Sequence, residues 1–399
     1  MKWKTIRADE FCESVRDGTH DTPKQTETGY KLLTSKHIKN GQITPVDAYY
    51  ISEEDYKKIN ARSLVEQWDV IMSMIGTVGE AAVVRNQPNY AIKNVALFKC
   101  AGCELKGKWL AYYLSSPDAQ GHMSGNQKGS SQQFLSLKQL RSLQIPITDE
   151  SYMLKVVDIL SAYDDLIENN QKQIKLLEEA AQRLYKEWFV DLRFPGHENT
   201  KITDGFPEGW RKYKFSDTTS IMGGGTPKTD VKEFYNGNIP FYTPKDSDDS
   251  FFAFDTITHI SQSGLDNCNS QLYPVNTIII TARGTVGKTT ILAVPMAMNQ
   301  SCYALKCDEL NSPYYLFFSL KNEVAALKTM SNGGVFNTII VKTFDSICLI
   351  APTQDVLNMF EASVSPIMEQ IKTKARQNII LTEARDRLLP KLMSGEIEL

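Results

Sequence analysis

The loop Arg283-Gly284-Thr285-Val286-Gly287-Lys288-Thr289 contains residue types that can hold a phosphate group. In nucleotide-binding phosphate loops, a glycine stands five positions before the Gly-Lys pair, and backbone N–H groups, the lysine and a hydroxyl contact the nucleotide and its metal ion. Position 282 is alanine here, and the similar segment Gly76-Thr77-Val78-Gly79 is followed by Glu80 instead of lysine. The sequence therefore favours a tight glycine turn between two strands, whose polar tip is a candidate for contact with a phosphate or a base edge.

Two cysteines, Cys100 and Cys103, have the spacing of half a zinc site or of a redox pair. Cys100 corresponds to Cys307 in the second half of the chain, but Cys103 corresponds to Leu310, and no second pair with this spacing occurs. We therefore expect structural cysteines and no metal site. The sequence also lacks an Asn-Pro-Pro-Tyr or Asp-Pro-Pro-Tyr box for methylating an amino group of a base, and we expect no catalytic residues.

Polar loops rich in Lys, Arg, Ser, Thr, Asn and Gln are the candidate contacts with nucleic acid. Arg, Asn and Gln side chains can read base edges, whereas Lys, Ser and Thr hold phosphates. In the first half the residues expected to contact DNA are Arg16, Thr19, His20, Lys24, Lys36, His37, Lys39, Thr77, Lys128, Ser130, Gln132 and Gln133. In the second half they are Thr226, Lys228, Tyr242, Lys245, Arg283, Thr285, Lys288, Asn332 and Asn337. The alternative for each of them is an ordinary solvated loop residue.

The chain repeats itself at an offset of about 207 residues, which identifies two equivalent structural units. Gly76-Thr77-Val78-Gly79 recurs as Gly284-Thr285-Val286-Gly287, and Gly18-Thr19-His20 recurs as Gly225-Thr226-Pro227. The matches keep the same order in both halves, so chance similarity is a poor explanation.

A long amphipathic helix is predicted from Met153 to Trp188, because apolar residues recur every seven residues and again three residues later. Asn170 is the only polar residue in this seam. A second helix with the same spacing is predicted from Val356 to Leu392, with a kink at Pro366. A narrow seam needs a partner, so the two helices are expected to pair with each other. The residues expected at their interface are Leu160, Ile167, Ile174, Leu177, Leu184, Phe360, Ile367, Ile371, Leu381 and Leu388.

Each unit begins with a stretch of mixed pattern, in which short apolar runs such as Val70–Met72 and Thr277–Ile280 predict strands and Tyr314–Leu320 predicts a short helix. The expected organisation is a globular domain at 1–150, a long helix at 151–193, a linker at 194–209, a second globular domain at 210–352 and a second long helix at 353–399. The fold class is α+β, with two repeated domains separated by two helices that form an antiparallel coiled coil around a pseudo-two-fold axis.

Composition limits the classes of function. The net charge is −3, so the chain lacks the basic excess of a stand-alone nucleic-acid binder. No apolar run approaches the roughly 18 residues of a membrane span, and the N-terminus has no signal-peptide pattern. The seven cysteines without such a signal indicate reduced thiols, which predicts a cytoplasmic protein.

These motifs resemble the specificity (S) subunits of type I restriction–modification enzymes. The segment Gly224-Gly225-Thr226-Pro227 followed by Gly237-Asn238-Ile239-Pro240-Phe241 is similar to that family's start of a target recognition domain. The loop Ala282–Lys288 followed by Asn299-Gln300 and the ending Arg387–Ile397 also resemble the family. The resemblance covers essentially the whole chain, although the family's proline pair and glutamine before each helix are replaced by Pro146-Ile147-Thr148-Asp149 and Ala351-Pro352-Thr353-Gln354.

The resemblance implies a subunit without an active site, in which each target recognition domain reads one half of a bipartite double-stranded DNA target. It implies that the helices set the spacer and dock two adenine-methylating modification subunits, and that motor-nuclease restriction subunits join them. S-adenosylmethionine, ATP and Mg are then expected on those partners only. Two alternatives stay open: a nucleotide-binding enzyme that uses the Arg283–Thr289 loop, and a coiled-coil scaffold with no role on DNA.

Overall fold

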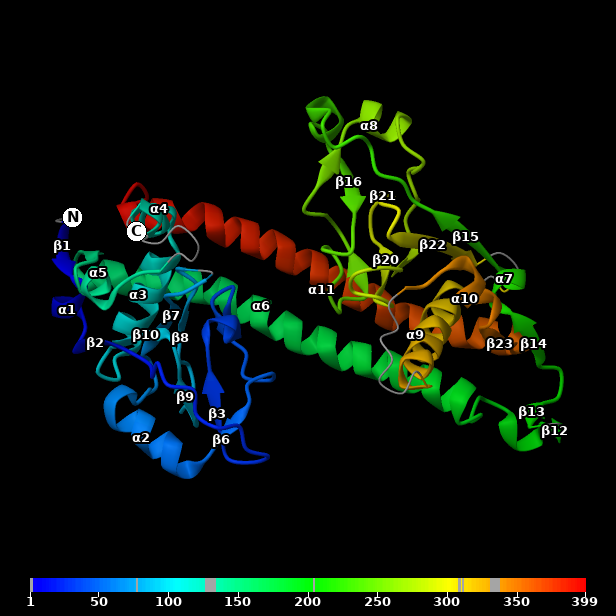
Figure 1. The fold of residues 1–399 in the computed structure, drawn as a ribbon, viewed down its shortest axis with the longest axis horizontal. Helices are drawn as coiled ribbons and strands as arrows, with labels where there is room; N and C mark the ends of the chain where they lie inside the picture. The colour runs from blue at the N-terminus through cyan, green and yellow to red at the C-terminus, as the bar shows by residue number, and fades with distance from the viewer. Residues whose placement is uncertain are drawn as a thin grey trace. The chain divides into compact units, whose positions relative to one another are not determined.

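The structure, a computed structural model, describes residues 3–76, 78–125, 134–203, 205–307, 310, 312–330 and 338–399 (Figure 1). The chain divides into two compact units. The first combines the chain up to Leu166 with Leu381–Leu399, and the second comprises Ile167–Ile380. Each long helix therefore contributes one part to each unit.

The first unit is built on a four-stranded sheet in which every neighbouring pair is antiparallel. Its strands, in spatial order, are β2 (Ser14–Asp17), β10 (Val95–Lys99), β7 (Val70–Ser73) and β8 (Ala81–Val83). A three-stranded sheet lies beside it in the order β6 (Tyr50–Ile51), β3 (Tyr30–Leu33) and β9 (Tyr90–Ile92). Two further pairs complete the strands: β1 (Lys4–Arg7) with β11 (Gln144–Ile147), and β4 (Ile38–Lys39) with β5 (Gln42–Ile43).

Helices cover the sheets of the first unit. They are α1 (Ala8–Phe11), α2 (Glu53–Ser63), α3 (Glu104–Ser115), α4 (Pro117–Gly125) and α5 (Leu137–Arg141). The indole of Trp109, on α3, is fully buried and donates a hydrogen bond to Pro146 O at 2.8 Å. The C-terminal segment completes this core, because Leu392 and Met393 are buried in it and the Tyr152 hydroxyl donates to Leu392 O at 3.1 Å and to Ile397 O at 2.7 Å.

The second unit repeats this plan, with one additional strand in its main sheet. Its main sheet has the order β15 (Thr219–Gly223), β22 (Cys302–Cys307), β19 (Ile278–Thr281), β20 (Thr289–Leu292) and β17 (Phe252–Ala253). The second sheet has the order β18 (His259–Ile260), β16 (Ile239–Tyr242) and β21 (Ala297–Met298), with β16 and β21 parallel as β3 and β9 are. The closing pair is β14 (Arg211–Lys214) with β23 (Cys348–Ala351), and the helices are α7 (Phe215–Thr218), α8 (Gln262–Asp266), α9 (Pro313–Met330) and α10 (Val341–Asp345).

Individual hydrogen bonds confirm the predicted repeat. The Tyr315 hydroxyl on α9 donates to Ile350 O at 2.5 Å, as the Trp109 indole on α3 donates to Pro146 O in the first unit. In both units this bond joins the helix that covers the main sheet to the strand leading into a long helix. The strands predicted at Val70–Met72 and Thr277–Ile280 are confirmed within a few residues. The helix predicted at Tyr314–Leu320 is confirmed, but it is longer than predicted, because α9 continues to Met330.

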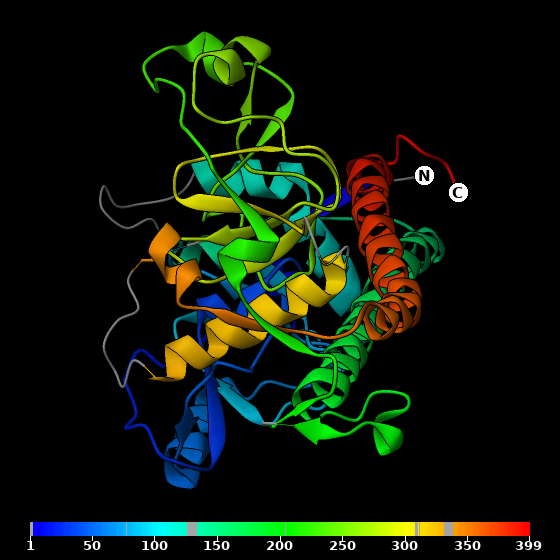
Figure 2. The same cartoon turned by 90° about the vertical axis from the view of Figure 1, so that its right-hand side faces the viewer.

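The two long helices are α6 (Glu150–Tyr185) and α11 (Gln354–Ser394), and they lie side by side within each unit (Figure 2). The start of α6 meets the end of α11 in the first unit, and its end meets the start of α11 in the second, so the pairing is antiparallel as predicted. Leu160 and Phe360 are fully buried, while Leu388 packs on the core of the first unit. Asn170 is only 8 % exposed, and its amide donates to Asn378 Oδ1 at 3.0 Å. The polar residue in the seam of α6 is therefore paired with a polar residue of α11.

One detail of the helices differs from the expectation. Helix α6 ends at Tyr185, and residues Lys186–Val190 form a π-helical turn (η2) that buries Trp188 and Phe189. Helix α11 continues through Pro366, and the kink expected at this proline stays a prediction.

The predicted linker is a folded segment. Its Phe194 is buried and lies 5.1 Å from the ring of Trp210, and a short hairpin of β12 (Ile202–Thr203) and β13 (Phe206–Pro207) follows. Among the described residues, no helix has both the length and the apolar character required to cross a membrane.

Burial of Glu178, on α6, raises the pKa of its carboxyl to about 6, although Lys321 acts in the opposite direction. Because the folded pKa lies above the unfolded value, the stabilising contribution is complete below the unfolded pKa and is lost as pH rises through 6. We expect Glu178→Gln to reduce the pH dependence of the free energy of unfolding in this window by at most about 2 kcal/mol. Urea titrations at a series of pH values test this, with Glu179→Gln at the exposed neighbouring position as the control. Equal pH dependence in the wild type and Glu178→Gln would contradict it.

Candidate nucleic-acid interface

The two glycine loops are hairpins with the same hydrogen bonds. Ser73 and Thr281 are fully buried at the ends of β7 and β19. The Ser73 carbonyl accepts from Gly79 N at 3.0 Å and its hydroxyl accepts from Glu80 N at 3.0 Å. The Thr281 carbonyl accepts from Gly287 N at 2.8 Å and its hydroxyl accepts from Lys288 N at 3.0 Å. A strand follows each loop, whereas a phosphate-binding loop opens a helix, so the structure favours the predicted glycine turn over the nucleotide site.

A capped turn precedes each hairpin in the chain. Thr34 N donates to His37 Nδ1 at 2.8 Å, and Thr243 N donates to Asp246 Oδ2 at 2.8 Å, so His37 and Asp246 play the same local role. His37 is 3 % exposed, and this burial lowers the pKa of its imidazole. The prediction that His37 contacts DNA is therefore wrong, because its ring is committed to the turn and is inaccessible. Lys36 and Lys245 are the exposed residues of the two turns.

Direct contacts join each hairpin to the segment that contains its capped turn. In the second unit the Thr285 hydroxyl donates to Pro244 O at 3.2 Å, within the capped turn, and lies 2.6 Å from Ser247 Oγ, and Lys288 forms an ion pair with Asp249. In the first unit Glu80 accepts at 2.9 Å from the N–H of Asn40, which lies in the turn between β4 and β5, just after the capped turn. The predicted residues Lys36 and Lys39 therefore belong to one loop cluster in the first unit. Lys245, Arg283, Thr285 and Lys288 belong to the corresponding cluster in the second.

The loops after β2 and β15 form the other part of each surface. His20 is exposed and its ring nitrogens lie 2.7 Å from Asn94 Oδ1 and 2.9 Å from Asp17 Oδ2. In the second unit the Thr226 hydroxyl is hydrogen-bonded to Gln300 Oε1. Neither Asn94 nor Gln300 was predicted as a site residue. The repeat identifies them, since Asn94 follows His20 by the same number of residues as Gln300 follows Thr226.

The match predicted between Gly18 and Gly225 is wrong by one residue. A Cβ on Gly18 would lie 2.3 Å from Ile92 O, and a Cβ on Gly224 would lie 2.5 Å from Met298 O. The following residues match as well, since Thr19 N donates to Ile92 O at 3.0 Å and Gly225 N donates to Met298 O at 3.1 Å. Gly18 therefore corresponds to Gly224 and not to Gly225, because only glycine allows this close approach of two backbones.

The remaining predicted residues fall into three groups. Tyr242 is 2 % exposed in the core between the sheets, and the prediction that it contacts DNA is wrong. Arg16, Lys24, Lys228 and Arg283 are exposed, and the Arg16 guanidinium donates to Arg62 O at 2.9 Å. Thr77, Lys128, Ser130, Gln132, Gln133, Asn332 and Asn337 lie outside the described residues.

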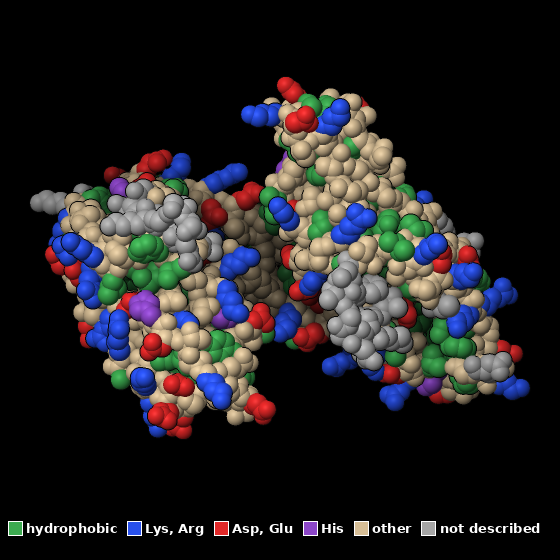
Figure 3. Space-filling view, in the orientation of Figure 1, with side chains coloured by type: hydrophobic (Ala, Val, Ile, Leu, Met, Phe, Trp, Pro, Cys, Tyr) green, Lys and Arg blue, Asp and Glu red, His purple; other side chains and the backbone are tan. Residues whose placement is uncertain are grey.

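Charge is mixed on the face shown in Figure 3, where Lys and Arg side chains stand among Asp and Glu on each unit and no large basic patch forms. This agrees with the net charge of −3. Non-specific attraction to DNA grows with the number of phosphates that the protein neutralises. DNA binding by a surface of mixed charge therefore depends on particular contacts or on partner subunits.

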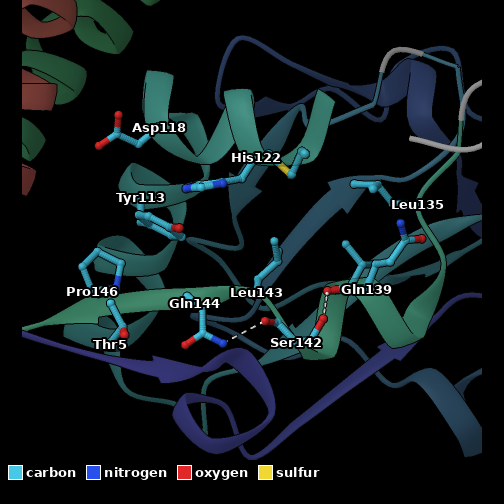
Figure 4. A pocket seen from close by; sticks show the side chains of 12 residues that line it. Thr5, Tyr113, Asp118, His122, Leu135, Gln139, Ser142, Leu143, Gln144 and Pro146 are labelled. Atoms are coloured by element: carbon cyan, nitrogen blue, oxygen red, sulfur yellow. Dashed lines mark hydrogen bonds between the residues drawn. The ribbon is translucent and has the colours of Figure 1, made fainter. Parts of the chain in front are cut away.

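A pocket of about 340 Å³ lies in the first unit (Figure 4), lined among others by Tyr113, Asp118, His122 and Gln144. Burial, together with the charge of Asp118, raises the pKa of the Tyr113 hydroxyl, which therefore stays a donor at neutral pH and is not a base. Among the described residues no cluster of His, Cys, Asp and Glu could hold a metal ion, and Cys100 is a buried free thiol.

Replacing Thr281 by valine should destabilise the second unit by about 1–3 kcal/mol, because Lys288 N and Thr285 O lose their partner inside the hairpin. Chemical unfolding of the variant measures the loss. Thr229→Val, at an exposed position, is the control. If both variants unfold at the same denaturant concentration, the hydroxyl does not hold the hairpin.

Comparisons with known proteins agree with this architecture. The family model described as "Type I restriction modification DNA specificity domain" matches residues 1–179 and 207–356. The type I restriction enzyme HindI specificity subunit of Haemophilus influenzae is 26 % identical over 325 residues, covering 66 % of this chain and 71 % of the relative. The MjaIX specificity subunit of Methanocaldococcus jannaschii is 25 % identical over 361 residues, covering 87 % and 81 %.

The fold is also similar to a solved structure. The crystal structure of a type I restriction–modification system S subunit from M. genitalium superposes with a TM-score of 0.58 at 15 % identity, and the match covers 98 % of this chain and 96 % of that one. Because the family model matches most of the chain and matches it twice, this chain belongs to the type I restriction–modification DNA specificity family, with one copy of the domain in each half.

Proposed function

We propose that this chain is the DNA-reading subunit of a type I restriction–modification complex and that each globular domain reads one half of a bipartite target. The observation that carries the proposal is the repeated loop cluster. In both units a glycine hairpin is hydrogen-bonded to the segment that contains a capped turn with an exposed lysine, Lys36 or Lys245, while the side chains around it differ. A common scaffold with different side chains is what two domains reading two different sequences require.

The long helices are proposed to set the distance between the half-sites and to dock two modification subunits. Restriction subunits complete the complex in the cytoplasm. S-adenosylmethionine, ATP and Mg bind to those partner subunits, and this chain contributes no catalytic group. The mixed surface charge supports a partnership, because modification subunits can supply further phosphate contacts.

The test is reconstitution. We expect no methyl transfer and no ATP hydrolysis by the purified chain, and sequence-specific adenine methylation after the cognate modification subunit is added. Methylated positions are mapped on a DNA library, with the modification subunit alone as the control. Turnover by the chain alone would support a nucleotide-binding enzyme, and methylation without any sequence preference would support a scaffold; either result contradicts the proposal.

A further inference from the structure

An amide side chain is held at the same place in both domains. Asn94 stands just before β10 and Gln300 just before β22, the corresponding central strand. Each is bonded to the loop after the first strand of the main sheet, Asn94 to His20 at 2.7 Å and Gln300 to Thr226. The scaffold is the same and both side chains end in an amide, so the two domains present the same functional group at this place.

Each amide keeps hydrogen-bonding capacity beyond this contact. An amide group has two N–H donors and an oxygen with two lone pairs. Within the described residues the structure gives each side chain one hydrogen bond, and Gln300 is exposed while Asn94 is half-buried. A neighbouring donor and acceptor are therefore left for a ligand. That pair matches the N7 acceptor and N6 donor that adenine presents in the major groove.

The partner residues hold the amides in position. Asp17 is 6 % exposed, and its carboxylate accepts from Arg62 Nη2 at 2.5 Å and bonds His20 Nε2 at 2.9 Å, so His20 is fixed from behind while its other nitrogen meets Asn94. Fixing a side chain before binding lowers the conformational entropy lost on contact. In the second domain the hydroxyl of Thr226, two residues after the closely packed Gly224, donates to Gln300 Oε1.

Turn geometry alone does not explain why an amide side chain occurs at both position 94 and position 300. Asn94 has a φ of +53°, a conformation that asparagine tolerates well, and this explains Asn94 in isolation. Gln300 is not among the residues with positive φ, yet it carries the same functional group and makes the equivalent contact.

We propose that Asn94 and Gln300 are specificity-determining residues that read an adenine, one in each half-site, through its major-groove edge. This inference rests on the proposed function and adds to it the residue and the base. His20 and Thr226 are positioning residues, which act by orienting the amides.

The experiment uses the chain in complex with its modification subunit and selects bound duplexes from a randomised target. Gln300→Ala should lose the preference for adenine at one position of one half-site, by about 5- to 150-fold, and leave the other half-site unchanged. Asn94→Ala should do the reverse. Gln300→Glu, which keeps the size but only accepts hydrogen bonds, should turn the preference at that position towards cytosine. Gln262→Ala, an exposed amide on α8, is the control and should change nothing.

A chemical probe separates reading from structural support. Replacing that adenine by 7-deazaadenine removes the N7 acceptor, so it should weaken binding by the wild type and have little further effect on Gln300→Ala. If the wild-type complex selects no sequence, the proposed function fails. If the wild type is selective but Gln300→Ala and Asn94→Ala keep every base preference, or lose preference at all positions together, the function stands and this inference is overturned.

Discussion

Exchanging residues 207–352 for the corresponding domain of another family member should change one half of the DNA target and leave the other half as it was. Each loop cluster is closed within its own unit, since Thr285, Pro244 and Ser247 bond one another and need no residue from the first domain. Binding to the original target should fall by on the order of 10³-fold or more, the usual ratio of specific to non-specific affinity.

The fold makes this exchange practicable. The two ends of the segment lie close together, because Arg211 on β14 pairs with Ala351 on β23. The donor must keep the aromatic contacts with the long helices, such as Tyr185 on α6 with Tyr315 at 6.0 Å between ring centroids. Selection from random DNA identifies both half-sites before and after the exchange, and re-insertion of the native segment is the control. A change in both half-sites would show that the domains do not read independently.

Adding one heptad to each long helix should lengthen the preferred spacer. The insertions belong after Leu166 and after Ile380, where each long helix passes from one unit to the other, so that each unit keeps its own helix contacts. One heptad adds about 10.5 Å of helix, which equals about three base pairs at 3.4 Å each. Three base pairs also rotate one half-site by roughly 100° about the duplex axis. Untwisting the DNA or re-aiming a domain costs energy, so we expect a longer spacer together with weaker binding.

Selection from duplexes that carry both half-sites at every spacer length measures this effect. A variant with the heptad in only one helix is the control, because it misaligns the seam and should destabilise the protein. If the double insertion folds, binds specifically and still prefers the original spacer, the helices do not determine the distance.

The sequence predicted the large elements because their physical causes are local. The seven-residue spacing from Met153 onward requires a helix with one apolar face, and the glycines of the two hairpins permit the tight turn at positive φ. Burial is decided by tertiary packing, and there the prediction failed. His37 and Tyr242 have polar groups and lie within three residues of an exposed lysine, but their neighbours in space enclose them. Asn94 was missed because an isolated asparagine carries no pattern until the strands place it beside His20.

The closing of the first core by the last residues of the chain has a consequence for biosynthesis. Leu392 and Met393 fill that core and Tyr152 bonds the carbonyls of Leu392 and Ile397, so the domain translated first is completed last. Until Leu392–Ile397 leave the ribosome, the N-terminal domain exposes the apolar surface that those residues later cover, and this surface is accessible to chaperones and proteases during that interval. A stop codon before Leu392 would therefore leave the core of the N-terminal domain uncovered, although it lies more than two hundred residues away in the sequence from Tyr152.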